Sequence, residues 1–315
     1  MINTLLYVTR FQFKPVQPYN FELTVKKPAG WSWFTPYEKW GNGTIWSGFW
    51  FEKMPIGVKA HSSKNEVMVK IYSNKKLSKE EVLRLKHQMS ESLGVNEDLR
   101  PFYKLMSKHR ILKHLVRRLY GMHEGWGMNI FSSLTLAILL QMAPIKRSEE
   151  MWDCLIRKYG KQIKFDGKTV LLWPIEETIA KLSPREIAKA CKVGYRAKFL
   201  VRLARQLVAG FPSIEELARM TPEEANNKLM ELFGVGEYTA GFASPHPSFS
   251  LDVWSIKIFY PIIFGKRAPA KDPRSVIKKA TLAAEKLWGE WRGMVLVYVL
   301  NDLPYLAERF KIPTI

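Results

Sequence analysis

Cysteine is scarce in this chain, since only Cys154 and Cys191 occur among its 315 residues. Two cysteines do not make the disulfide framework of a small secreted domain or a four-cysteine metal cluster. The six histidines are scattered, and no Cys/His spacing predicts a zinc site. The sequence also contains no Walker loop for phosphate binding and no dinucleotide fingerprint. These absences argue against a disulfide scaffold, a zinc protein and the common nucleotide-binding folds.

Long hydrophobic runs are missing as well. The most apolar stretches, residues 134–140 and 294–300, are far too short to span a bilayer. The first ten residues contain no basic leader and no long apolar run, so we expect no signal peptide. We therefore expect a soluble, intracellular (cytoplasmic, nucleoid-associated) protein with no membrane partner. No heptad seam is visible, which favours a monomer.

Acidic residues are few relative to basic ones. Lys and Arg total 49 against 29 Asp and Glu, which gives a formal net charge of +20 and a pI of about 9.8. A globular protein with this excess usually binds a polyanion, and the charge agrees with a double-stranded DNA partner. The alternative is a thermostable protein with a lysine-rich surface. Hyperthermophile surfaces typically balance lysine with glutamate, however, so the imbalance favours nucleic acid.

The first 95 residues have a composition and pattern typical of an antiparallel sheet. Segments rich in β-branched and aromatic residues are separated by Pro, Gly and Asn, and a capping box at Ser78–Glu81 opens a helix that ends near Gly94. The predicted strands are residues 4–13, 20–26, 43–51, 56–62 and 66–71. We therefore predict an N-terminal α+β domain over residues 1–95. Its aromatic segment Trp31–Tyr37 is either core or a stacking platform for bases.

From Asn96 onward the apolar residues recur at three and four positions, which predicts helices. The expected helices are residues 101–119, 129–141, 148–159, 175–182, 183–191, 196–207, 213–220, 222–233, 273–287 and 291–300. Asp272 is the natural N-cap of the ninth helix, with Pro273 at its first position. The fold class is thus α+β, with a mostly α-helical domain over residues 96–315 after the sheet domain.

A glycine pair between two helices is the most informative motif. Thr221 and Glu224 form a capping box that opens one helix, and Gly234-Val-Gly236 separates this helix from a second one. Glycines without Cβ atoms leave consecutive N–H groups open to an oxygen anion, and the second helix adds its positive N-terminus. Residues 222–244 therefore predict a hairpin that binds a DNA phosphate. The simpler alternative is an ordinary corner between helices with glycine caps.

A single aspartate, Asp252, follows the hairpin at short range in the segment Phe249–Trp254. Breaking the bond between a base and its sugar builds positive charge on the sugar. A carboxylate held beside the sugar stabilises that charge and can orient or deprotonate water. Asp252 therefore fits catalysis on the nucleotide next to the bound phosphate. It also precedes a plausible helix, so the alternative is a helix N-cap, and one residue can serve both roles.

Five motifs occur in the order typical of one enzyme family. They are Ala137–Met142, Val193–Ala197, the hairpin, Leu251–Trp254 and Trp288–Gly293. Residues from about Asn96 onward resemble the helix-hairpin-helix (HhH-GPD) DNA glycosylase superfamily, which removes damaged bases from DNA. The N-terminal sheet resembles the extra domain, similar to the TATA-binding protein (TBP-like), of the 3-methyladenine glycosylase II and 8-oxoguanine glycosylase branches. The resemblance implies a base-excision repair enzyme that hydrolyses the N-glycosidic bond of a flipped base.

The resemblance assigns roles to individual residues. Asp252 occupies the catalytic position. The phosphate-binding N–H groups belong to Gly234, Gly236 and Tyr238. The backbone carbonyls that hold a monovalent cation, Na⁺ or K⁺, belong to Met230, Leu232 and Val235. No cofactor is required, and the sequence after Asn301 lacks the four-cysteine run that holds an iron–sulfur cluster in other branches.

Base flipping requires a wedge that fills the gap in the duplex and a pocket that receives the base. In the family the wedge follows a glutamine, which corresponds to Gln141 and makes Met142 the wedge. The residues that correspond to the pocket walls are Tyr238, Phe242 and Leu300. Leu300 departs from the family, which often has an aromatic residue there. Tyr298 and Trp291 are possible substitutes, although Trp291 is equally plausible as core.

Tyr238 stands where bifunctional members have a lysine that attacks the sugar, forms a Schiff base and nicks the strand. A phenol cannot form that imine, so the expected enzyme is monofunctional and leaves an abasic site. Aromatic walls attract the cationic ring of an N-alkylated purine, which makes such a base the expected substrate. An 8-oxoguanine or deaminated base is the alternative substrate, and a non-catalytic lesion-binding protein is the alternative of another class. Only thirteen residues separate Tyr238 from Asp252, so the loop between them must be tight.

Overall fold

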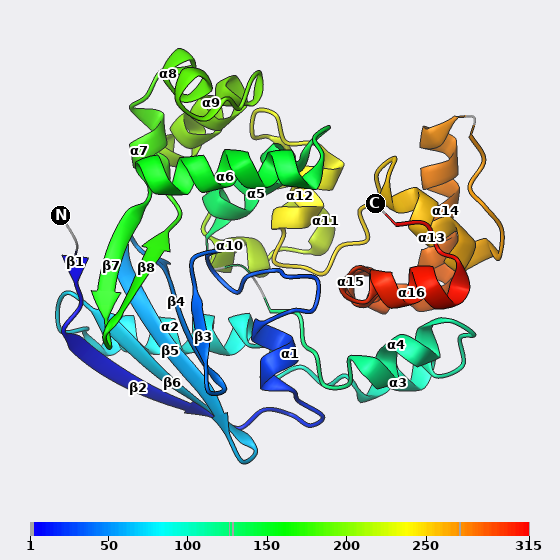
Figure 1. Ribbon diagram of the computed structural model, residues 1–315, viewed down its shortest axis with the longest axis horizontal. Coiled ribbons are helices and arrows are strands. Elements are labelled where there is room, and N and C mark those ends of the chain that lie inside the picture. The colour runs from blue at the N-terminus through cyan, green and yellow to red at the C-terminus, as the bar shows by residue number, and fades with distance from the viewer. Residues whose placement is uncertain (1–2, 126, 128, 271, 315) are drawn as a thin grey trace.

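The computed structural model describes residues 3–125, 127, 129–270 and 272–314, and it confirms an α+β fold (Figure 1). An antiparallel sheet has the strand order β2-β6-β5-β4-β3. Its strands are β2 (Tyr7–Phe13), β3 (Lys39–Gly41), β4 (Thr44–Phe51), β5 (Met54–Ser63) and β6 (Glu66–Ser73). Helix α2 (Lys79–Ser92) begins at the predicted capping box and packs Leu85 and Met89 into the apolar core of this sheet.

One predicted strand is wrong. Residues 20–26 contain helix α1 (Phe21–Val25), and the Asn20 side chain accepts a hydrogen bond from the backbone N–H of Leu23 at 3.0 Å. This cap starts the helix, and the buried residues that follow have helical spacing. The cap and the period of the buried positions therefore outweigh the β-branched composition of the segment.

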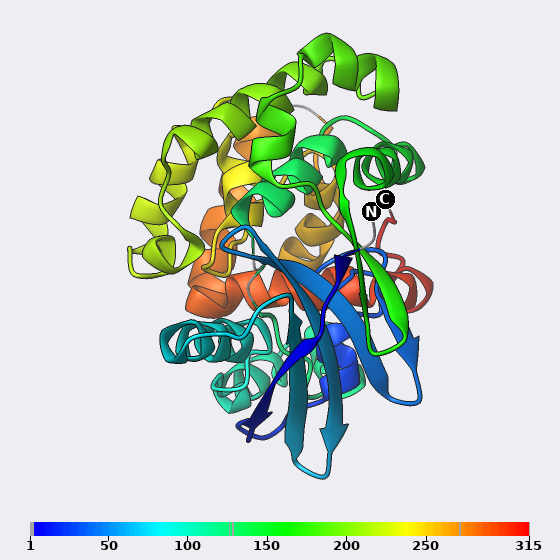
Figure 2. The same cartoon turned by 90° about the vertical axis from the view of Figure 1, so that its left-hand side faces the viewer.

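A hairpin that the sequence analysis missed lies against the sheet. The strands concerned are β1 (Asn3–Thr4), β7 (Lys161–Phe165) and β8 (Lys168–Leu172). β7 pairs antiparallel with β8 and parallel with β1. The hairpin packs on Gly48 and Gly57, where a Cβ atom would come within 2.7 Å of Leu172 and 2.5 Å of Phe165. Figure 2 shows the green hairpin crossing the blue strands, on the face opposite the core that α1 and α2 cover.

The first predicted helix of the C-terminal part is two helices, α3 (Arg100–Met106) and α4 (Leu112–Arg118). Between them, Nδ1 of His109 accepts hydrogen bonds from the N–H groups of Ile111 and Leu112, at 3.2 Å each. The histidine ring therefore takes the N–H groups that a continuous helix would bond to its own backbone. The prediction of one long helix is wrong for this reason.

The remaining helices form two lobes with separate apolar clusters. The hairpin lobe contains α5 (Ile130–Leu140), α6 (Ile145–Tyr159), α7 (Glu176–Ala180), α8 (Pro184–Cys191), α9 (Arg196–Ala209), α10 (Ile214–Ala218), α11 (Pro222–Met230) and α12 (Glu237–Ala243). The terminal lobe contains α3, α4, α13 (Ser255–Phe264), α14 (Pro273–Trp288), a 3-10 turn (Gly289–Trp291), α15 (Arg292–Asn301) and α16 (Leu303–Phe310). Within the described residues, no helix is both long and apolar enough to cross a bilayer.

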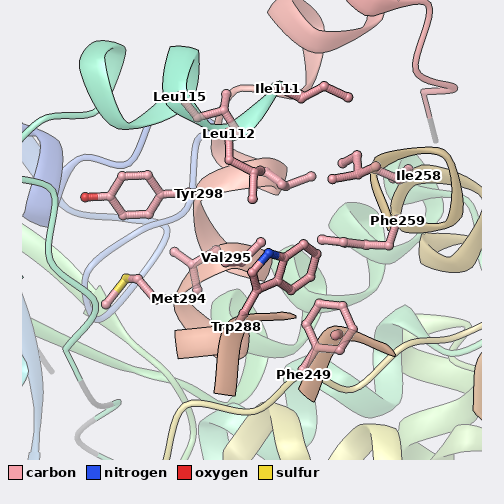
Figure 3. Packing of buried hydrophobic residues seen from close by; sticks show 14 of the residues in the cluster. Ile111, Leu112, Leu115, Phe249, Ile258, Phe259, Trp288, Met294, Val295 and Tyr298 are labelled. Carbon is pink, nitrogen blue, oxygen red and sulfur yellow. The ribbon is translucent and has the colours of Figure 1, made fainter. Parts of the chain in front are cut away.

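The chain passes between the two lobes twice. It builds α3 and α4, continues through the hairpin lobe and returns to the terminal lobe at Phe249. Figure 3 shows this return, where the Phe249 ring contacts the rings of Phe259 and Trp288 with centroids 5.1 and 5.7 Å apart. Residues 244–254, the crossing segment, therefore lie between the hairpin helix α12 and the start of α13.

Cys154 and Cys191 form a disulfide that joins α6 to α8, with 5.4 Å between the Cα atoms. The sequence analysis did not predict this bridge, because two cysteines 37 positions apart indicate no framework by themselves. Packing of α6 beside α8 in the hairpin lobe brings the two sulfur atoms together. The bridge closes a loop that contains the β7–β8 hairpin and α7.

Candidate active site

Asp252 lies in the crossing segment just before α13, and its side chain is half-buried. Its Oδ1 accepts hydrogen bonds from the N–H groups of Trp254 (3.1 Å) and Ser255 (2.7 Å) and from the Ser255 hydroxyl (2.7 Å). Its Oδ2 accepts none from the residues that the structure describes. Through one oxygen, Asp252 therefore caps the turn that leads into α13, in line with the alternative interpretation. Its other oxygen is left for a ligand.

Tyr238 on α12 lies close enough to Asp252 to be affected by its charge. Burial, and then the negative charge of Asp252, raise the pKa of Tyr238 from its ordinary 10.0 to about 12. The phenol is therefore neutral at physiological pH and keeps a proton to donate. The hairpin helix and the crossing segment thus bring Tyr238, which the sequence analysis assigned to the base pocket, near Asp252, which it assigned to catalysis.

The predicted hairpin is present as α11, a tight turn and α12. The Thr221–Glu224 capping box opens α11, although this helix ends at Met230 rather than near Phe233. Gly234 has a φ of +83°, and a Cβ atom there would lie 3.0 Å from the Phe199 ring. Glycine is therefore required at position 234 both by the backbone and by the packing of α9.

Gly236 differs from Gly234 in its backbone conformation and in the space around it. Its backbone is extended, it caps α12 without a side-chain hydrogen bond, and a Cβ atom there would meet nothing within 4 Å. The first N–H groups of α12, that of Tyr238 among them, have no acceptor within their own helix. The start of α12 is therefore open to a ligand that approaches the backbone.

The carbonyls expected to hold a cation lie in the same turn. They belong to Met230, Leu232 and Val235. The Leu232 carbonyl accepts a hydrogen bond from the Val235 N–H at 3.1 Å, which leaves it a second lone pair. Carbonyl oxygens are ligands that suit monovalent cations, so the donor set fits Na⁺ or K⁺. Elsewhere in the described residues, no group of three or more His, Cys, Asp or Glu side chains could hold a metal ion.

Met142 follows α5 as an exposed apolar residue in the left-handed conformation, with φ of +49° and 82 % exposure. The buried Arg196 side chain holds this turn, because its Nε donates to the carbonyl of Ile138 (3.2 Å) and its guanidinium also donates to the carbonyl of Gln141. Gln141 in turn donates through Nε2 to the hydroxyl of Thr239 on α12 (2.9 Å). The sequence analysis recognised the motifs that contain Arg196 and Thr239 but missed these contacts.

The expected pocket walls come from both lobes. Phe242 lies one turn after Tyr238 on α12 and is 42 % exposed. Leu300 is half-buried and packs against the cluster of the terminal lobe. Of its possible substitutes, Tyr298 is 1 % exposed with its hydroxyl hydrogen-bonded inside the terminal lobe, so it is wrong as a pocket wall. Trp291 is half-buried and packs against the same cluster as Leu300, so its role stays a prediction.

Two glycines accommodate the short loop before Asp252. A Cβ atom on Gly241 would come within 2.0 Å of the Ser250 hydroxyl oxygen, and one on Gly293 would come within 2.6 Å of the Pro247 backbone. The loop therefore lies directly against α12 on one side and α15 on the other. This close packing explains how so few residues connect the hairpin to Asp252.

Comparisons with known proteins agree with this geometry, although no family model matches the chain. The DNA-3-methyladenine glycosylase of Bacillus subtilis (strain 168) is 25% identical over 234 residues, which cover 71% of this chain and 73% of that protein. The 3-methyladenine DNA-glycosylase from Archaeoglobus fulgidus has a TM-score of 0.71 at 19% identity, covering 94% of this chain and 98% of that one. The Clostridium acetobutylicum 8-oxoguanine glycosylase/lyase, in complex with double-stranded DNA containing cytosine opposite 8-oxoG, has a TM-score of 0.69 at 18% identity, covering 97% and 99%. These likenesses support the helix-hairpin-helix DNA glycosylase superfamily that the sequence motifs resemble.

An aromatic side chain that the sequence analysis did not assign follows Asp252. Trp254 is 51 % exposed, and the Lys257 ammonium lies over its ring at 4.5 Å from the centroid. An exposed tryptophan beside a cation is a surface that suits a nucleic acid. Its signal in the sequence was its place in Leu251–Trp254, directly after the aspartate.

Proposed function

We propose that this protein is a DNA base-excision glycosylase that hydrolyses the N-glycosidic bond of a flipped, damaged base and leaves an abasic site without nicking the strand. The observation that carries this proposal is the divided role of the Asp252 carboxylate. Oδ1 is held at the start of α13, while Oδ2 has no partner in the described chain and the charge acts on Tyr238 of the hairpin helix. A helix cap alone would not require an unpartnered Oδ2 or a carboxylate close to Tyr238.

The chemistry depends on a carboxylate held in one orientation. As the bond between the sugar C1′ and the base nitrogen breaks, its electrons leave with the base and positive charge builds on the sugar. The Asp252 carboxylate stabilises this oxocarbenium-like state. Water then adds to C1′ and gives up a proton to Asp252. The three hydrogen bonds to Oδ1 fix the carboxylate for this role.

The hairpin and the wedge support base flipping. The N–H groups that bind the phosphate beside the lesion belong to Gly234, Gly236 and Tyr238. Met142 fills the gap that the flipped base leaves, which lowers the cost of unstacking. A bound Na⁺ or K⁺ would stabilise the turn. The carbonyls that would hold it belong to Met230, Leu232 and Val235.

The phenol of Tyr238 supports a monofunctional reaction, because strand nicking through an imine requires an amine at the sugar. Lys257, the lysine near Asp252 in sequence, is exposed with its ammonium over Trp254. The neutral rings of Tyr238 and Phe242 favour a cationic, N-alkylated purine. The alternative substrate is an 8-oxoguanine or deaminated base, and likeness to the Clostridium 8-oxoguanine glycosylase/lyase keeps it open. The alternative of another class is a non-catalytic lesion-binding protein.

The proposal extends to the organisation of the chain. Residues 1–95 form a TBP-like sheet domain and residues 96–315 form the glycosylase domain. The protein acts as a monomer on DNA inside the cell, because one active site between two helical lobes suffices for the reaction.

A panel assay tests the substrate and the mechanism together. Duplexes that carry 3-methyladenine or 7-methylguanine, 8-oxoguanine, hypoxanthine or uracil are scored for abasic sites before and after alkali. We expect release of an alkylated purine, with strand cleavage only after alkali. Borohydride trapping of a covalent complex with DNA would contradict the monofunctional mechanism, because trapping requires an imine.

The variant Asp252→Asn tests the catalytic carboxylate. Asparagine still caps a helix but carries no charge, so we expect excision to fall at least about 100-fold with little change in stability. Asp272→Asn is the matched control, because Asp272 caps α14 by accepting from the Ser275 N–H at 3.3 Å. Full activity of Asp252→Asn would remove the catalytic role. Tight binding without base release from any duplex would favour the lesion-binding protein.

A further inference from the structure

A basic concavity lies between the N-terminal sheet and the hairpin lobe, and neither Asp252 nor Tyr238 lines it. Its volume is about 750 Å³. The side chains that line it and enter the argument are Tyr37, Glu38, Lys39, Arg157, Lys168 and Thr169. They come from β3 and the loop before it, from α6 and from β8, so segments distant in sequence build the concavity.

Three cationic side chains line this concavity, and two of them form no ion pair within the described residues. Arg157 on α6 is paired with Asp153, with 2.9 Å between Nε and Oδ2. Lys39 and Lys168 form no ion pair within the described residues, and the Lys168 ammonium lies 5.2 Å from the Trp46 ring centroid. Like charges around one concavity repel each other, and the low-dielectric walls concentrate their field. An anion bound there would remove this repulsion.

The acid that lines the concavity does not neutralise these cations. Both carboxylate oxygens of Glu38 accept from the Trp33 N–H, at 3.2 and 3.1 Å, and one also accepts from the Ser47 hydroxyl at 3.0 Å. The carboxyl group of Glu38 is thus turned toward the loop that carries Trp33 and toward Ser47 on β4. Burial raises the pKa of Glu38 to about 7, so the carboxyl is partly neutral at physiological pH.

A flat surface forms one wall. The Tyr37 hydroxyl donates a hydrogen bond to Asp153, and the Arg157 guanidinium lies 5.1 Å from the Tyr37 ring centroid. Asp153 therefore holds both groups in place. Of the aromatic segment that was either core or a stacking platform, Trp33 stacks on Phe34 at 4.2 Å and packs on the sheet core. Tyr37 is the aromatic residue of that segment that reaches the concavity.

We propose that this concavity is a second nucleotide-binding site, in which Lys39 and Lys168 bind a phosphate and the Tyr37–Arg157 surface stacks on a base. Cations beside a stacking surface are the chemistry that binds single-stranded nucleic acid. The phosphate ester belongs either to a DNA strand that extends from the active site or to a free mononucleotide. The first source rests on the proposed function, whereas the second is independent of it.

Two measurements on the full-length protein test the site and separate the sources. The double variant Lys39→Ala/Lys168→Ala is compared with Lys76→Ala/Lys79→Ala, which removes the same charge from exposed lysines near the start of α2. If a DNA strand occupies the site, the slope of log K against log salt for duplex binding becomes shallower by about 1 in the first variant only, because one phosphate contact is lost. If a free nucleotide occupies it, calorimetric titration with AMP shows at least a tenfold loss of affinity in the first variant only.

Either change supports the proposal and shows whether the bound phosphate belongs to a DNA strand or to a free mononucleotide. The proposal is overturned if the salt slope is unchanged and the parent protein does not bind millimolar AMP. It is also overturned if the salt slope is unchanged and the Lys39→Ala/Lys168→Ala variant binds AMP as tightly as the parent. We expect base excision at saturating DNA to be unchanged in both double variants. Failure of this second site is therefore distinct from failure of the glycosylase assignment.

Discussion

The side-chain amide of Gln141 donates a hydrogen bond to the hydroxyl of Thr239, with 2.9 Å between Nε2 and Oγ1. Thr239 is buried in the hairpin helix, and Gln141 immediately precedes the exposed Met142. This contact ties the turn that carries Met142, the proposed wedge, to the helix that carries Tyr238. The positions of Met142 and Tyr238 therefore depend on each other.

A double-mutant cycle measures this dependence. Thr239→Val keeps the shape of the buried side chain and removes the acceptor, while Gln141→Leu removes the donor. We expect each single variant to slow single-turnover excision, and the double variant to be no slower than the worse single one. The coupling free energy should be about 1 kcal/mol, the usual value of a neutral hydrogen bond. Additive effects would show that the two side chains act separately.

Arg196 should stabilise the wedge turn more than an exposed arginine with the same pattern of bonds. Replacement by methionine leaves the carbonyls of Ile138 and Gln141 without their charged donor, so we expect the free energy of unfolding to fall by about 2–3 kcal/mol. Arg205→Met is the matched control, because Arg205 donates to the carbonyls of Ala180 and Leu182 from an exposed position. Denaturant unfolding of both variants checks the difference. Equal losses would contradict a special role for Arg196.

Met142→Gly should separate stability from function. Glycine adopts the left-handed conformation of position 142 without strain, so the free energy of unfolding should rise by up to about 1 kcal/mol. Loss of the side chain should slow excision from a fully paired duplex more than from one with the lesion in a mismatch, where unstacking is easier. Lys311→Gly, at another left-handed residue, relieves similar strain and should leave excision unchanged. Equal slowing on both duplexes would argue against a wedge.

The candidate site was predictable because its residues belong to short local patterns. The capping box at Thr221, the glycine pair and the aspartate that begins a helix are each readable within a few positions. The tight loop before Asp252 also followed from counting residues. What remained hidden was the packing that makes this loop feasible, since Gly241 and Gly293 contact it from different helices.

Two errors have local causes, since Asn20 caps α1 and His109 separates α3 from α4, whereas others arose where distant segments decide the structure. The β7–β8 hairpin carries a local signal, an Asp166-Gly167 turn between alternating residues, but its place in a helical region concealed it. Contacts of Arg196 with the end of α5 join residues 55 or more positions apart. Tyr298 looked available as a pocket wall because its burial in the terminal lobe depends on α3 and α4.

The disulfide predicts a stability that depends on redox conditions. The bridge closes a loop between α6 and α8, and loops of this size contribute roughly 3–4 kcal/mol by constraining the unfolded chain. A reductant should therefore lower the melting temperature of the parent protein. The variant Cys154→Ser/Cys191→Ser should melt near the reduced parent and should not respond to the reductant. A parent that melts at the same temperature with and without reductant would show that the bridge contributes nothing.

Tyr238 predicts a loss of stability in alkali. Its pKa of about 12 lies above the ordinary 10.0, so the folded protein holds this proton more tightly than the unfolded chain does. The contribution is therefore complete below pH 10 and is lost as pH rises from about 10 to about 12. Tyr238→Phe keeps the ring but removes the ionisable hydroxyl, so its free energy of unfolding should fall less between pH 9 and 11. Tyr37 and Tyr72, whose pKa values are also raised to about 12, lower the free energy of unfolding in alkali equally in both proteins. Parallel curves for parent and variant would contradict the burial of the phenol beside Asp252.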